Sequence, residues 1–222
     1  YMNKEHFSEA IYLLKTKAKL AGKIIKIPGI DEENFPVRNS MLGIVPQGKV
    51  FLSDEVAEFL FAVDEVSKEE NYEIPFLLFG KNDKQNVFID SYVSSGISGR
   101  TEANFSGLNS ALQDFISKSN KDGTDVVVHG HSHPKIGSYY TNFSLGDMKT
   151  YMQFRKDNQV FDNDKICLIS CLITDGNFNF LFYDGNDYYK FKEVYERMPS
   201  GELERLKCYQ SPDVIINHDR EY

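Results

Sequence analysis

The sequence predicts a mixed α/β domain, and three observations carry this prediction. The chain has 222 residues, of which 41% are hydrophobic, so it is long enough to bury a large core. Continuous apolar runs of strand length occur at 74–81 and 165–174, and segments of helical periodicity lie between them. Turn signals, such as the Asp-Gly pair at 175–176, separate neighbouring runs.

The N-terminal part of the chain predicts two helices and one strand. Apolar residues recur at helical spacing over 5–22, which indicates a helix. The stretch 48–53 is typical of a short strand. Ser53 and the two acidic residues after it then supply the N-cap and first turn of a helix over 54–70.

The middle of the chain predicts a hairpin followed by a helix and a strand. The apolar run at 74–81 and the stretch 86–93 flank a polar turn, which favours an antiparallel pair. A Gly/Ser-rich loop at 93–108 leads to a helix at 110–119. The β-branched stretch 126–134 then predicts a strand that contains three histidines.

The C-terminal part predicts a helix over 148–157 and a buried strand over 165–174. A second strand is expected over 178–185, and a last strand or the start of a helix over 186–195. The polar tail that begins at Pro199 predicts only a short helical stretch.

These patterns divide the chain into an N-terminal helical extension (1–48), a central domain (49–198) and a C-terminal tail (199–222). The net charge of -8 argues against nucleic acid or an anionic membrane surface as a partner. No apolar run approaches the roughly 18 residues of a membrane span, and no signal peptide is evident, so we expect a cytoplasmic protein. Its three cysteines are expected to be reduced, with Cys167 and Cys171 in the core.

The stretch H-G-H-S-H-P, residues 129–134, is the strongest chemical signal in the chain. Residues two apart share one face of a strand, so His131 and His133 project together. Two imidazoles and the carboxylate of Asp147 would hold a tetrahedral zinc ion with its fourth position open, as catalysis requires. His129 shares the face, but a fourth protein ligand would close the site, so we expect it to support the structure instead.

A simpler interpretation stays open for each part of this signal. Residues 144–147, S-L-G-D, match the capping pattern that begins many helices, and an aspartate there needs no metal. An H-x-H pair on a strand also arises by chance as a partly buried polar pair. Taken alone, Asp147 is better explained as part of a helix cap.

A further set of residues favours the metal site over a helix cap and a chance pair of histidines. A strand that begins at Glu73 has the sequence E-I-P-F-L-L-F-G-K. It is followed along the chain by H-S-H-P, which contains His131 and His133, and then by S-x-x-D, which contains Ser144 and Asp147. In type and order these residues resemble the motif of the JAMM, or MPN+, zinc metalloprotease family. The resemblance extends from about residue 49 to about residue 189 and implies a JAMM/MPN-like mixed β-sheet flanked by helices.

The resemblance also implies a role for each of these residues. His131, His133 and Asp147 would bind Zn²⁺ as the cofactor. Glu73 would act as general base and then general acid, and Ser144 would donate a hydrogen bond to the oxyanion of the reaction intermediate.

The chain departs from the family pattern in two places. The loop 135–143 between Pro134 and Ser144 is longer than in the family, and at the usual spacing the metal carboxylate would fall on Ser144. Asp147 can be the metal carboxylate only if the longer loop bulges outward and the following helix begins at the same place in the fold as in the family. Phe76 stands where relatives commonly carry a small residue, and we expect this to affect local packing alone.

The resulting hypothesis is a zinc metallopeptidase, in particular an isopeptidase that removes a ubiquitin-like modifier from a protein substrate. One alternative is a non-catalytic scaffold of the same fold, which would be expected to have lost metal-binding residues. Another is a JAMM-like hydrolase of small amides. The signatures of the nucleobase deaminases and of the H-E-x-x-H peptidases are missing from the sequence.

Overall fold

The computed structural model describes residues 48–83, 86–94, 106–119, 125–134, 143, 145–162, 166–183 and 188–208. The helix predicted over 5–22, most of the loop 135–143 and Ser144 lie outside the described residues. Within the described part, no helix is both long and apolar enough to cross a membrane.

A nine-stranded mixed sheet forms the centre of the molecule, in the order β7-β6-β5-β4-β2-β3-β1-β8-β9. Its pairs are antiparallel except for β1–β3, β1–β8 and β4–β5, which are parallel. The strands are β1 (Val50–Ser53), β2 (Pro75–Asn82), β3 (Val87–Ser94), β4 (Asp125–Ser132), β5 (Ile166–Thr174), β6 (Asn177–Tyr183), β7 (Tyr188–Lys190), β8 (Val194–Arg197) and β9 (Leu203–Leu206).

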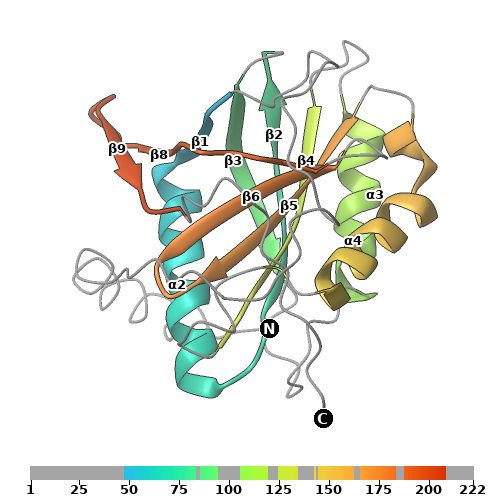
Figure 1. Cartoon of the computed structure of the whole chain (residues 1–222). Helices are drawn as coiled ribbons and strands as arrows, with labels where there is room; N and C mark the ends of the chain where they lie inside the picture. Colours follow the sequence, from blue (N-terminus) through green and yellow to red (C-terminus); the bar gives the residue numbers. More distant parts are fainter. Residues whose placement is uncertain are drawn as a thin grey trace.

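Helices cover both faces of this sheet (Figure 1). Helix α2 (Asp54–Glu70) packs on one face, and α3 (Asn109–Lys118) and α4 (Leu145–Asp157) lie on the other. The predicted N-cap of α2 is confirmed, because the Ser53 hydroxyl accepts a hydrogen bond of 3.3 Å from the Val56 N–H. Alternate residues of the central strands therefore enter two separate apolar clusters, one on each side of the sheet.

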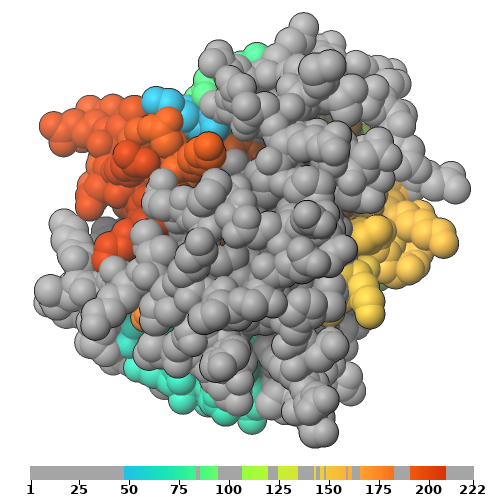
Figure 2. All heavy atoms as spheres, viewed as in Figure 1, coloured from blue at the N-terminus to red at the C-terminus, as the bar shows by residue number. Residues whose placement is uncertain are grey.

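Most of the predicted strands and helices of the described region are confirmed. Over 186–195, where a strand or the start of a helix is expected, the structure has the strand β7 and the start of a second strand, β8. The described part of the C-terminal tail, residues 199–208, contains β9, which pairs antiparallel with β8 and was not predicted. The rest of the tail, 209–222, lies outside the described residues, so the short helical stretch expected in the tail stays a prediction. The sheet thus continues past residue 198, and the β8–β9 hairpin and α4 reach the surface on opposite sides of the molecule (Figure 2).

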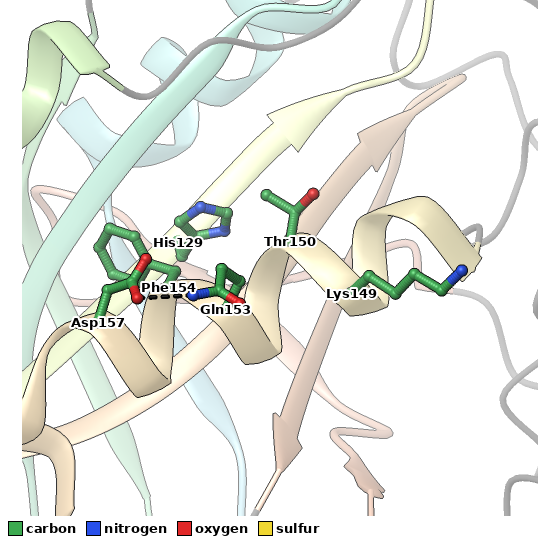
Figure 3. Close-up of a pocket in the computed structure, with 6 residues that line it drawn as sticks. All are labelled: His129, Lys149, Thr150, Gln153, Phe154 and Asp157. Atoms are coloured by element: carbon green, nitrogen blue, oxygen red, sulfur yellow. Dashed lines mark hydrogen bonds between the residues drawn. The ribbon is translucent and has the colours of Figure 1, made fainter.

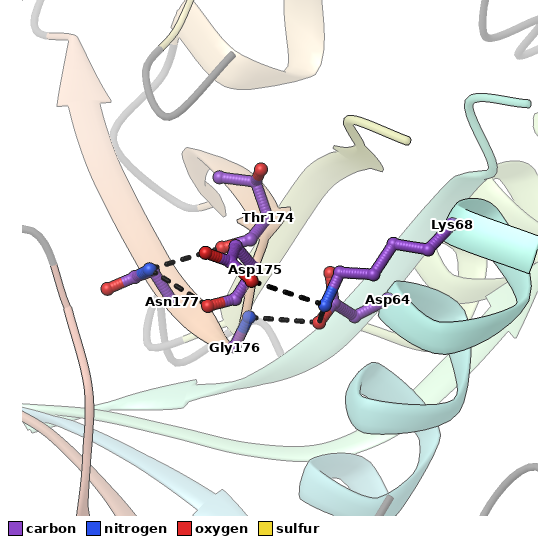
Figure 4. Close-up of polar contacts among 6 residues, drawn as sticks. All are labelled: Asp64, Lys68, Thr174, Asp175, Gly176 and Asn177. Carbon is purple, nitrogen blue, oxygen red and sulfur yellow. Dashed lines mark hydrogen bonds and ion pairs between the residues drawn. The ribbon is translucent and has the colours of Figure 1, made fainter. Parts of the chain in front are cut away.

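Asp64 and Lys68 pair with each other on α2 and link this helix to Asp175 and Gly176 in the turn between β5 and β6 (Figure 4). The Asp64 carboxylate accepts hydrogen bonds from the Lys68 ammonium at 2.6 Å and from the Gly176 N–H at 2.9 Å. Asp175 and Gly176 have positive φ angles of 48° and 70°, as the predicted Asp-Gly turn requires. Burial raises the pKa of Asp64 above its usual value although the Lys68 charge opposes this.

Candidate metal centre

Strand β4 delivers two of the predicted ligands to one place. All eight of its residues are buried, and its neighbours are β2 on one side and β5 on the other. His131 is the last residue but one of the strand, and His133 follows its end, held to β5 by a 3.0 Å hydrogen bond from its N–H to the Ile173 carbonyl. The strand alternation therefore continues to His133, and both imidazoles face the same side, as predicted.

Helix α4 supplies Asp147, the third predicted ligand. Its first turn contains Asp147, so the helix begins where it must for this carboxylate to reach the histidines. The two carboxylate oxygens lie 3.1 Å from His131 Nε2 and 3.3 Å from His133 Nε2. A helix cap does not require such contacts, so the capping pattern alone does not explain Asp147.

The spacing of these three side chains fits a small cation. The two Nε2 atoms lie 3.2 Å apart, and each is a similar distance from the Asp147 carboxylate. Zinc bonds of about 2.0–2.1 Å in a tetrahedron would put neighbouring ligand atoms about 3.3 Å apart. His131, His133 and Asp147 thus form a group that could hold a metal ion.

The surroundings of Asp147 favour its charged form, which a metal ligand requires. Burial by itself would raise the pKa of this carboxyl group. The charges and hydrogen bonds of His131 and His133 lower this pKa by more than burial raises it. The pKa of Asp147 is therefore held well below its usual value. The side chain is therefore deprotonated at neutral pH, as a metal ligand must be.

Glu73 lies at the edge of this group. It precedes β2, and antiparallel pairing of β2 with β4 brings this end of β2 to the histidines, with Pro75 opposite His131. The Glu73 side chain is buried, and its Oε1 lies 3.9 Å from His133 Nε2. The carboxylate is thus beside the three-residue group but outside hydrogen-bond distance of that nitrogen.

His129 lies on β4 two residues before His131, on the same face of the strand. Its ring packs 4.5 Å from the Phe154 ring, centroid to centroid, and 6.5 Å from that of Tyr151, both on α4. Burial, the main cause, and the neighbouring His131 charge lower the pKa of His129 to about 3, so the ring is neutral. The three-residue group does not include it, which agrees with the structural role expected from the sequence.

An open hollow of about 460 Å³ lies along the flank of α4 (Figure 3). None of the three grouped residues lines it. No pattern in the sequence indicates this hollow, since polar residues such as 150, 153 and 157 on one helix flank are typical of any exposed helix face. Its lining residues are His129, Lys149, Thr150, Gln153, Phe154 and Asp157.

Phe76 explains why a glycine lies between two of the histidines. A Cβ atom at Gly130 would clash with the Phe76 ring, which is fully buried and packs edge to face on Phe59 at 5.8 Å. The large residue that departs from the family pattern is therefore accommodated by the missing side chain opposite it on β4.

Neither a scan against models of protein families nor a search of curated proteins finds a match for this chain. The case for an activity accordingly depends on the residues of the metal centre, their geometry and the motif resemblance. The role predicted for Ser144 stays a prediction, since this residue lies outside the described part of the chain.

Proposed function

We propose that this protein is a zinc-dependent hydrolase of amide bonds, with His131, His133 and Asp147 as the zinc ligands. The observation that carries the proposal is the mutual distance of 3.1–3.3 Å between these ligand groups. Two imidazoles and one carboxylate are a ligand set that zinc accepts, and they leave one position open. Zinc bound there would supply a Lewis acid and an activated water molecule.

Glu73 has the proton-transfer role in this proposal. Its carboxylate would accept a proton from the attacking water and donate it to the leaving amine, as general base and then general acid. The burial of Glu73 and its position beside His133 support this role, because a proton acceptor must lie near the reacting atoms without occupying the open position. The Ser144 hydroxyl would stabilise the oxyanion.

The proposed substrate is an isopeptide bond between a lysine side chain and a ubiquitin-like modifier. Support comes from the resemblance of Glu73, the H-S-H-P run and Asp147 to the JAMM motif. The net charge of -8 is compatible with a basic partner surface. A scaffold without activity would not need a buried carboxylate beside three grouped ligands, so we place that alternative second.

Two measurements on the purified protein test the proposal. Elemental mass spectrometry should find about one zinc per chain, and the protein should cleave a ubiquitin conjugate linked through lysine. His131→Ala should lose both zinc and cleavage. A folded wild type that takes up no metal would refute the metal centre. Iron in place of zinc would refute the zinc enzyme and favour an oxygenase, since that ligand set also binds iron(II).

A panel of substrates separates the remaining alternatives. Zinc binding without cleavage of any amide would favour the scaffold. Cleavage of a short lysine isopeptide at the same kcat/KM as the full conjugate would favour a hydrolase of small amides, because a folded modifier would then contribute no binding energy.

A further inference from the structure

Both chain neighbours of Glu73 are held by serine residues, each of them fully buried. Tyr72 is bound to Ser67, in the last turn of α2, and Ile74 is bound to Ser132, the last residue of β4. In each case the serine makes two hydrogen bonds to that neighbour, one through its backbone and one through its hydroxyl group. Glu73 itself lies between these two anchored residues.

The bonds to Ser67 fix the segment before Glu73. The Ser67 hydroxyl donates to the Tyr72 carbonyl at 2.6 Å, and the Tyr72 N–H donates to the Ser67 carbonyl at 3.2 Å. Helix α2 ends at Asn71 in the left-handed conformation, with φ 56°, so the chain must reverse direction here. The serine hydroxyl thus satisfies a backbone carbonyl directly after the end of the helix.

The bonds to Ser132 fix the segment after Glu73. The Ile74 N–H donates to the Ser132 hydroxyl at 3.0 Å, and the Ser132 N–H donates to the Ile74 carbonyl at 3.2 Å. The next residue, Pro75, has no N–H to donate to β4. On the C-terminal side of Glu73, the nearest N–H that donates to β4 is therefore that of Ile74, one residue before β2.

Ser132 cannot act on the metal centre directly. Strand alternation puts its side chain on the α2 face of the sheet, opposite to His131 and His133. Its hydroxyl reaches the Ile74 backbone instead. An effect of Ser132 on chemistry must then pass through the backbone of the Glu73 segment.

We propose that Ser67 and Ser132 are positioning residues that hold the Glu73 carboxylate beside the His131, His133 and Asp147 group. This inference rests on the proposed function, because it assigns the two serines to the proton transfer by Glu73. We call Ser67 and Ser132 the serine clamp. Misplacement of a reacting group by about 1 Å can lower a rate by about a hundredfold, so a loosened Glu73 should be costly.

The test compares Ser67→Ala, Ser132→Ala and Ser53→Ala in the full chain. Ser53 is the matched control, because its hydroxyl also accepts a backbone bond on α2 but is remote in sequence from Glu73. Each clamp variant should keep its zinc and its KM and lose about 10–100-fold in kcat. Ser53→Ala should keep kcat. Ser132→Thr, which retains a hydroxyl group, should recover most of the loss.

Two further readouts distinguish positioning from general destabilisation. In the Glu73→Gln background, the clamp variants should lower kcat no further, whereas a structural defect would lower it again. Hydrogen exchange of the Ile74 amide in the metal-free protein should be up to about tenfold faster in Ser132→Ala and unchanged in Ser53→Ala. Unchanged exchange, or an equal loss of kcat in the control, would overturn the proposal.

The exchange measurement also separates this inference from the proposed function. If the wild type cleaves no amide while Ile74 exchange still depends on Ser132, the proposed function fails and the clamp is only a structural element. If the wild type is active and the clamp variants keep full kcat, the proposed function stands and the positioning role is refuted.

Discussion

His131 and His133 point their Nε2 atoms at each other across 3.2 Å. Two imidazoles at this distance need something between or beside them, either a shared proton or a metal ion. The Asp147 carboxylate lies against both nitrogens, so the group has negative charge to attract a cation. The two explanations predict different responses of the folded protein to added zinc.

Zinc should stabilise the wild type against unfolding if these residues are its ligands. A ligand at about a thousand times its dissociation constant adds about 4 kcal/mol to the free energy of unfolding. Urea unfolding of metal-free protein, with and without zinc, measures this difference. In Asp147→Asn the zinc effect should be greatly reduced, whereas loss of a helix cap would cost about 1 kcal/mol whether or not zinc is present. An equal zinc effect in both proteins would contradict the site.

Glu73→Gln should retain zinc and lose turnover. The amide has the same shape as the carboxylate but cannot accept the proton, so we expect kcat to fall by about 10²–10⁴-fold. Steady-state cleavage and elemental mass spectrometry on the same sample check both points. Glu196→Gln is the matched control, since Glu196 is also a buried glutamate but lies on β8 near the far edge of the sheet. Full activity of Glu73→Gln would refute its role.

Part of the metal centre could be anticipated because its geometry is local, whereas the choice of Asp147 as a ligand also needed the family resemblance. Strand alternation alone places His131 and His133 on one face, and the helical pattern after Ser144 predicts that Asp147 starts a helix. Glu73 was harder, because no local rule brings β2 next to β4. The family resemblance pointed to Glu73 through the type and order of its motif residues, and the pairing of Pro75 with His131 shows how the fold brings this segment to the histidines.

Other features could not be derived from the sequence, because they depend on which strands become neighbours. Periodicity identifies a strand but not its partners, so the position of β1 between β3 and β8 was not predicted. The edge strand β9 was not predicted for the same reason. The serine clamp was missed because Ser67 and Ser132 are ordinary buried serines until the fold brings them to either side of Glu73.

Gly130→Ala should destabilise the protein strongly, since the added methyl group would clash with the Phe76 ring. Overpacking of a core costs about 1–3 kcal/mol. Phe76→Leu removes part of the ring and should relieve the clash, so the double variant should be more stable than the sum of the single effects predicts. A double-mutant cycle from urea unfolding measures this coupling. Additive effects would show that the backbone shifts instead of the ring.

The buried pair of Asp64 and Lys68 should give stability a characteristic pH dependence. Burial raises the pKa of Asp64 in the folded state, while the unfolded value is about 3.9. Between these two values the folded protein binds more protons than the unfolded chain. The Asp64 contribution therefore favours folding at low pH and is lost as pH rises through the folded-state pKa.

Asp64→Asn removes this titration and still offers an oxygen to the Gly176 N–H. The free energy of unfolding of the wild type minus that of Asp64→Asn should therefore fall as pH rises above about 4. Lys68→Met is the complementary variant. It should destabilise at pH 7 by on the order of 2 kcal/mol, because it leaves the Asp64 carboxylate buried without its cation, and much less at low pH. Urea unfolding across this range measures both effects, and a difference between wild type and Asp64→Asn that does not change with pH would contradict the raised pKa.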